Sequence, residues 1–135
     1  MTLYLLDTNA VSAMVREPAG AIGVRVDLVG RTMICTSVVV AAELRYGLAK
    51  RKSARLTSRV EAVLESLVVI PFGSPAEAIY GMIRADIESR GRTIGQMDLL
   101  IAAHALALDC ILVTDNDGEF RRVPGLRVEN WLREG

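Results

Sequence analysis

Short, continuously apolar runs recur along the chain, and segments with helical spacing separate them. The runs cover residues 3–6, 33–36, 68–70 and 111–114, with a weaker one at 126–128. Between them, apolar residues at intervals of three and four predict helices over about 10–16, 21–29, 38–50, 56–67, 76–90 and 97–108. Strands without polar alternation are typical of parallel sheets covered on both faces, so we expect an α/β fold with a mainly parallel sheet.

Polar residues mark the ends of these elements. Ser37 is a helix cap, and the polar link 51–54 predicts that the helices on its two sides form a hairpin. The tetrapeptide 74–77 (Ser-Pro-Ala-Glu) predicts a capping box with proline at the first helical position. No linker, repeat or low-complexity segment interrupts the pattern, and we expect a single domain over residues 1–135.

Composition narrows the function classes. Sixteen basic and sixteen acidic residues cancel in this 135-residue chain, so its overall charge does not indicate a polyanionic partner. Cys35 and Cys110 lie in apolar runs and are expected to be small buried hydrophobes. The chain shows no apolar stretch long enough for a signal peptide or a membrane span, and we expect a cytoplasmic protein.

Four acidic residues stand where a polar group is least expected. Asp7 and Asp115 each follow an apolar strand directly, so both are predicted at the carboxyl edge of the sheet, where α/β proteins bind ligands. Asp98 opens a nearly all-apolar helix, and Glu43 lies in the middle of a helix on its apolar face. Taken singly, the aspartates could be helix caps or turn residues, and Glu43 could belong to a buried ion pair.

Taken together, these carboxylates favour metal-dependent chemistry. Acidic groups that meet in a poorly solvated place repel one another, and a proton or a cation must offset their charge. Oxygen ligands select Mg²⁺, or Mn²⁺, over zinc. Such an ion can activate water against a phosphodiester, which is nuclease chemistry.

The residues also carry a resemblance that covers almost the whole chain. Its motifs are Leu-Asp-Thr-Asn (6–9), Ser-Val-Val-Val-Ala-Ala-Glu-Leu-Arg-Tyr-Gly (37–47), Ile-Gly-Gln-Met-Asp-Leu-Leu-Ile-Ala-Ala-His-Ala (94–105) and Leu-Val-Thr-Asp-Asn (112–116) with Glu119-Phe120. In this order they resemble the PIN-domain family and, more narrowly, the VapC-type toxin ribonucleases of type II toxin–antitoxin systems.

The resemblance implies a PIN-like three-layer α/β/α sandwich, an Mg²⁺-dependent endoribonuclease, and tRNA as the first substrate to test. It also implies a homodimer and a cognate antitoxin whose C-terminal segment covers the active site. Carried over residue by residue, it implies Asp7 and Asp98 as metal ligands and Glu43 as a further catalytic carboxylate.

The fourth acidic position departs from the family pattern, because many members have an aspartate where this chain has Asn116. We expect Asp117 to complete the catalytic set, with Asp115 and Asn116 as alternatives, and the number of metal ions stays open. Thr8 and Asn9 are expected either to orient Asp7 or a metal-bound water or simply to cap the helix.

Basic residues near these positions are candidates for RNA contact. They are Arg45 and Arg51 on the helical hairpin and Arg92 on the loop before Asp98. The single histidine, His104, lies on a different helical face from Asp98 and is expected to pack in the core or an interface rather than act as a base.

Other functions fit the sequence less well. A phosphoacceptor receiver domain needs a late lysine, and no lysine follows Lys52. A haloacid-dehalogenase phosphatase needs a second aspartate where Asn9 stands. The open alternative is a non-catalytic or RNA-binding domain that keeps the carboxylates as a structural cation site.

Overall fold

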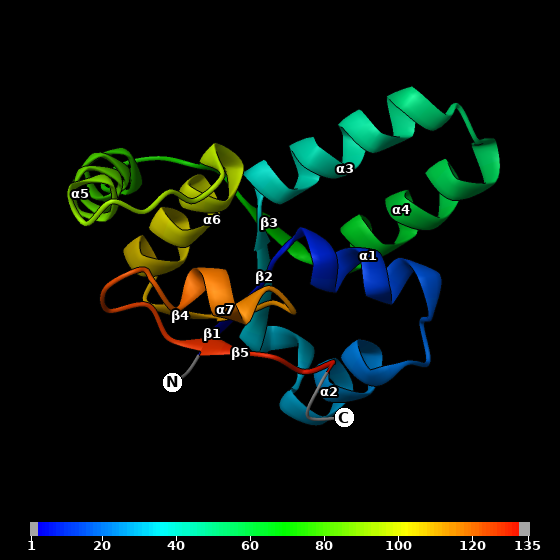
Figure 1. The fold of residues 1–135 in the computed structure, drawn as a ribbon. Coiled ribbons are helices and arrows are strands. Elements are labelled where there is room, and N and C mark those ends of the chain that lie inside the picture. Colours follow the sequence, from blue (N-terminus) through cyan, green and yellow to red (C-terminus); the bar gives the residue numbers. More distant parts are fainter. Residues whose placement is uncertain (1–2, 133–135) are drawn as a thin grey trace.

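One parallel sheet forms the middle of the molecule, in a computed structural model that describes residues 3–132 (Figure 1). The strands pair in the order β3-β2-β1-β4-β5, and every pairing is parallel. Their bounds are β1 (Leu3–Leu6), β2 (Ile34–Ser37), β3 (Val68–Ile70), β4 (Cys110–Val113) and β5 (Val128–Glu129). The parallel sheet predicted from the apolar runs is therefore confirmed.

Helices fill the connections and cover both faces of the sheet. In Figure 1, α5 and α6 lie on one side and α1, α2 and α4 on the other, while α3 and α4 extend beyond the sheet as a hairpin. The bounds are α1 (Thr8–Arg16), α2 (Ala21–Val29), η1 (Arg31–Met33), α3 (Val38–Arg51), α4 (Ala54–Ser66), α5 (Ala76–Ser89), α6 (Gln96–Ala107) and α7 (Asp117–Phe120). The six predicted helices and the predicted hairpin are confirmed.

Three local predictions were wrong. The capping box over residues 74–77 does not form, because Pro75 itself precedes α5 and no side chain caps the helix. The last strand is Val128–Glu129 and not 126–128. Asp117, for which a turn was the alternative to a catalytic role, begins the short helix α7.

Aliphatic side chains make the core around the two central strands. Leu5 and Leu6 of β1 and Leu112 and Val113 of β4 are fully buried. Cys35 and Cys110 are buried free thiols with their sulfur atoms 4.0 Å apart, as expected for small apolar residues. Among the described residues, no helix is long and apolar enough to span a bilayer.

Trp131, the one tryptophan of the sequence, packs the C-terminal part of the described chain against the sheet. Trp131 is fully buried, and its ring lies 5.2 Å from that of Tyr4 on β1. Its indole N–H donates to Glu129, and the guanidinium of Arg25 on α2 stacks over its ring. This packing joins α2 and the residues after β5 to the central strand.

The register of β1 and β4 brings Asp7 and Thr114 to the same edge of the sheet. Leu6 pairs with Val113, so the next residues, Asp7 and Thr114, emerge at the same level of the carboxyl edge. The chain passes from β1 to β2 and β3 on one side, and β4 and β5 lie on the other. Ligands of open α/β sheets bind where the strand order reverses in this way.

Candidate active site

Asp7 is a buried carboxylate at the junction of β1 and α1. It is 3% exposed and caps α1, accepting the backbone N–H of Ala10 at 2.9 Å. Its own N–H donates to the carbonyl of Val113 at 3.0 Å, which fixes it to the end of β4. Burial raises the pKa of Asp7 to about 7, and the charges of Asp115 and Asp98 add to the rise against hydrogen bonds from Thr114 and Ala10.

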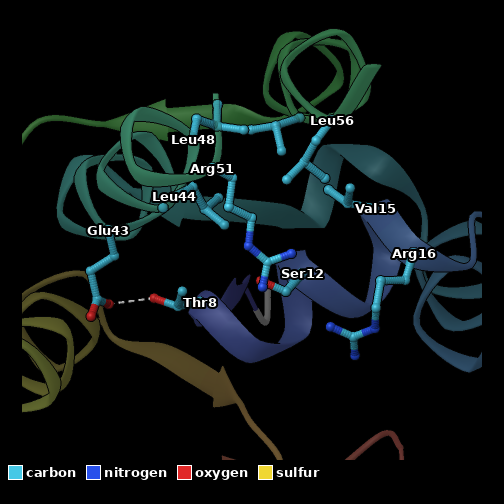
Figure 2. A pocket seen from close by; sticks show the side chains of 11 residues that line it. Thr8, Ser12, Val15, Arg16, Glu43, Leu44, Leu48, Arg51 and Leu56 are labelled. Carbon is cyan, nitrogen blue, oxygen red and sulfur yellow. Dashed lines mark hydrogen bonds between the residues drawn. The ribbon is translucent and has the colours of Figure 1, made fainter. Parts of the chain in front are cut away.

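Glu43 lies one turn into α3 and faces the start of α1. The hydroxyl of Thr8 donates to its Oε1 at 2.5 Å (Figure 2). The interpretation of Glu43 as half of a buried ion pair is wrong, because its hydrogen-bond partner is the Thr8 hydroxyl and not an arginine. Thr8, expected to orient Asp7 or a water, holds Glu43 instead.

Asp98 stands in the first turn of α6 and is half-buried. Burial raises the pKa of Asp98 to about 6, and the charges of Glu119 and Glu43 contribute. Asp98 also contributes to the raised pKa of Asp7. The three carboxylates named from the sequence, Asp7, Glu43 and Asp98, thus share one electrostatic environment.

Glu119 is a site residue that sequence reasoning did not select. Its Oε1 accepts the N–H of Gly95 at 3.3 Å, just before α6, and its Oε2 accepts the side-chain amide of Asn116 at 2.8 Å. These two bonds hold the Glu119 carboxylate beside Asp98. The sequence feature that could have identified Glu119 was the Glu119-Phe120 pair among the motifs that resemble the PIN-domain family.

The candidates for the fourth acidic position have different surroundings in the structure. Asp117 is 6% exposed, and its carboxylate contacts the amide of Asn130 at 3.2 Å and the guanidinium of Arg121 at 3.5 Å. Asp115 is exposed and acts on Asp7 through its charge. Asn116 anchors Glu119. Asp117 is thus engaged in contacts within the C-terminal part of the molecule, while Glu119 is the acid next to Asp98.

Two further polar residues near the site have clear positions. Asn9 is exposed, and none of the hydrogen bonds found within residues 3–132 involves its side chain. His104 is 2% exposed, shares a 2.7 Å hydrogen bond with the Ser37 hydroxyl and packs edge-on against Phe72. Burial lowers the pKa of His104. Its expected place in the core is confirmed.

The three arginines predicted to contact RNA differ in their surroundings. Arg45 forms a salt bridge with Glu61, which joins α3 to α4. Arg51 lines a groove next to Glu43. Arg92 is exposed on the loop between α5 and α6. Arg51 is therefore the one of the three whose guanidinium lies in a cavity.

The groove opens directly from the acidic residues (Figure 2). It measures about 270 Å³ and lies between α1, α3 and α4, with Thr8 and Glu43 at one end. Aliphatic side chains make its floor, and Ser12, Arg16 and Arg51 line its rim. A substrate that reaches Glu43 therefore has a shaped surface beside it.

The donor set fits a hard divalent cation. All the candidate ligands are carboxylates, and mutual repulsion adds to the raised pKa values of Asp7 and Asp98, so a cation would relieve a real cost. Among residues 3–132, no three Asp, Glu, His or Cys side chains converge into a ready cluster. Mg²⁺ does not need one, because it commonly binds one or two carboxylates and keeps several waters.

Known proteins are similar to this chain over nearly its whole length. The family model described as PIN domain matches residues 4–126. Ribonuclease VapC2 of Rickettsia felis is 39% identical over 131 residues, covering 96% of this chain and 98% of that protein. The tRNA(fMet)-specific endonuclease VapC of Shigella flexneri is 35% identical over 135 residues, covering 97% and 99%.

Solved structures are similar over the same length. The crystal structure of VapBC2 from Rickettsia felis bound to a promoter DNA fragment matches with a TM-score of 0.90 at 36% identity, covering 96% of this chain and 99% of that one. DNA-bound VapBC from Salmonella typhimurium matches with a TM-score of 0.88 at 33% identity, covering 97% and 99%.

Proposed function

This chain belongs to the PIN-domain family and is a nuclease of the VapC ribonuclease type, and on that premise we propose that it is an Mg²⁺-dependent endoribonuclease that cleaves tRNA as the toxin of a toxin–antitoxin pair. The observation that carries the proposal is that three carboxylates, Glu43 of α3, Asp98 of α6 and Glu119 of α7, influence one another beside the buried Asp7 that precedes α1. A structural cation site alone would not require an open groove next to it.

Asp7 and Asp98 would hold the ion. Their carboxylates are the two whose pKa values are raised, so they gain most from a positive charge. When bound, Mg²⁺ supplies Lewis acidity that strengthens water as a nucleophile and offsets negative charge on the phosphate; Mn²⁺ has the same donor preference.

The chain's own residues would orient the reactants. Thr8 fixes one oxygen of Glu43, which leaves the other oxygen to orient a water and accept its proton. We assign the fourth acidic position to Glu119 in place of Asp117, because Glu119 lies beside Asp98 while Asp117 contacts Arg121 and Asn130.

The proposed partners follow from the relatives and from charge. One relative is named for tRNA(fMet), and the similar structures are VapBC complexes. An antitoxin segment that covers this site would place an arginine or lysine among the carboxylates. We also propose a homodimer acting in the cytoplasm, and light scattering of the pure chain would give twice the monomer mass.

Sequencing the 5′ ends of RNA fragments after controlled expression tests the substrate. We expect new ends at one position of one tRNA, absent from cells that express Asp7→Asn. Ends spread over many messenger RNAs would contradict tRNA specificity, and no new ends at all would contradict ribonuclease toxicity. Co-purification of a small basic partner supports the antitoxin, and unchanged cleavage in that partner's presence counts against it.

A further inference from the structure

We propose that the groove between α1, α3 and α4 is a nucleotide subsite, which holds the RNA nucleotide next to the cleaved phosphodiester with its phosphate on Arg16 and Arg51. The inference rests on the proposed ribonuclease function and adds the residues that hold the substrate. It assigns a binding role to Arg16, Ser12 and Gly47, which the sequence did not single out.

The place of the groove makes it part of the substrate's path. Thr8 and Glu43 line its near end, and the same two side chains are joined by a hydrogen bond within the acidic site. An RNA strand whose phosphodiester reaches Glu43 can therefore lay an adjoining nucleotide in the groove that begins at this residue.

Charge favours an anion at the rim. Figure 2 shows the guanidinium of Arg51 pointing into the groove toward Ser12, with Arg16 further along α1. Within the part of the chain that the structure describes, neither arginine forms a salt bridge, whereas Arg45 and Arg84 each pair with a glutamate. Guanidinium groups free to form paired hydrogen bonds suit phosphate.

The floor suits the sugar and base. Val15, Leu44, Leu48 and Val60 are almost fully buried below the groove, and Leu56 is half-buried at its side. Among residues 3–132, no aromatic ring lines the groove, so a base would contact aliphatic carbon rather than stack. The Ser12 hydroxyl is the polar group on α1 that could bond its edge or the ribose.

Gly47 gives the groove its depth. It lines the groove from α3, and a Cβ added there would meet no atom within 4 Å. A larger side chain at residue 47 would therefore start from open space on the groove wall and occupy part of the subsite without changing charge.

Binding of a fluorescein-labelled single-stranded oligoribonucleotide tests the subsite, measured by anisotropy in an Asp7→Asn background that prevents cleavage. Adding Arg51→Ala or Arg16→Ala should weaken binding about tenfold each, the usual scale for a charged hydrogen bond. Each should also lower the slope of log Kd against log salt by about 0.7. Arg51→Lys should keep the slope and recover part of the affinity.

Gly47→Leu should weaken binding as much as Arg51→Ala but leave the salt slope unchanged. The matched control is Arg84→Ala, which removes one exposed arginine on α5 and should change neither quantity. Circular dichroism confirms that each variant is folded. In cleavage assays with an intact Asp7, the groove variants should raise KM for RNA far more than they change kcat.

Unchanged RNA affinity in Arg16→Ala, Arg51→Ala and Gly47→Leu would overturn the subsite and leave the groove to a protein segment. An equal loss in Arg84→Ala would overturn it too, because it would show a diffuse charge effect. A different result would contradict the proposed function itself: the native chain would cleave no RNA at any Mg²⁺ concentration, whatever the groove binds.

Discussion

Asp7 places a carboxyl group where the protein can least solvate its charge. It directly follows the fully buried Leu5 and Leu6 of β1, and the nearby charges of Asp115 and Asp98 are also negative. Function rather than stability explains such a group, because an amide of the same shape could accept the Ala10 N–H equally well. The chain thus tolerates a costly ionised group in the absence of metal.

Because an ionised Asp7 destabilises the metal-free protein, Asp7→Asn should raise the free energy of unfolding measured in EDTA by an amount that depends on pH. The pKa of Asp7 is about 7 in the folded state against 3.8 when unfolded, so the folded chain holds the proton more tightly. Its contribution to stability is complete below the unfolded value and is lost as pH rises through 7. The free energy of unfolding of the variant should therefore rise relative to that of the native chain between about pH 4 and about pH 8, by at most roughly 4 kcal/mol.

Urea unfolding followed by the fluorescence of the buried Trp131 measures this gain. A difference between the two chains that does not change with pH would contradict the raised pKa.

Thr8 provides a second residue-scale prediction, because its hydroxyl donates to Glu43. Thr8→Val keeps the shape and loses the hydroxyl, so kcat should fall about tenfold while KM for RNA stays similar. Thr8→Ser keeps the hydroxyl and should stay near the native rate. Equal losses in both variants would mean that the methyl group, and not the hydrogen bond, matters.

Individual site residues were predictable from the sequence only where a strand or a long helix located them. Asp7 follows an apolar strand, and Asp98 and Glu43 lie on long helices, so their periodicity gave their positions. Glu119 lies on the four-residue helix α7 and depends on bonds to Gly95 and Asn116. A helix that short has no period to detect, and the bond to Gly95 spans distant residues.

At the scale of elements, helix glycines offer a matched pair of substitutions. Both Gly47 on α3 and Gly23 on α2 are interior helix positions. Gly47→Ala should raise the free energy of unfolding by about 0.5–1 kcal/mol, because its Cβ meets open space. Gly23→Ala should lower it by about 1–3 kcal/mol, because the Cβ would lie 2.1 Å from the Pro18 carbonyl oxygen.

Thermal unfolding monitored by circular dichroism measures both changes. Opposite signs are the expected result, and two changes of the same sign would show that helix propensity alone decides these sites.

The elements themselves were largely predictable because their apolar periods are regular. β1, β3 and α2 have the predicted bounds. The errors fall where a specific side-chain contact, which the apolar period does not report, decides the outcome. α1 begins at Thr8 because the Asp7 carboxylate caps it, and Arg59, which could have paired within its own helix, donates instead to the carbonyls of Val15 and Arg16.

On the scale of the whole molecule, equal numbers of acidic and basic residues hide a local separation. Acids from three helices and Asp7, at the end of β1, meet at the carboxyl edge of the sheet, and Arg16 and Arg51 line the groove beside them. A net charge of zero cannot reveal this arrangement, whereas the strand order does, because it reverses beside β1. The fold thus provides a place for a cation next to a place for a polyanion.

The most direct test of this account is the rate of RNA cleavage by the pure chain with Mg²⁺ and with EDTA, compared with Asp7→Asn and Asp98→Asn. The control is Asp109→Asn, an exposed carboxylate at the opposite end of β4 with a left-handed backbone that asparagine accepts. We predict cleavage with Mg²⁺ alone, a loss of about a hundredfold or more in each site variant, and a native rate in the control. Cleavage in EDTA, or cleavage that survives in Asp7→Asn and Asp98→Asn, would contradict a carboxylate-held metal as the basis of catalysis.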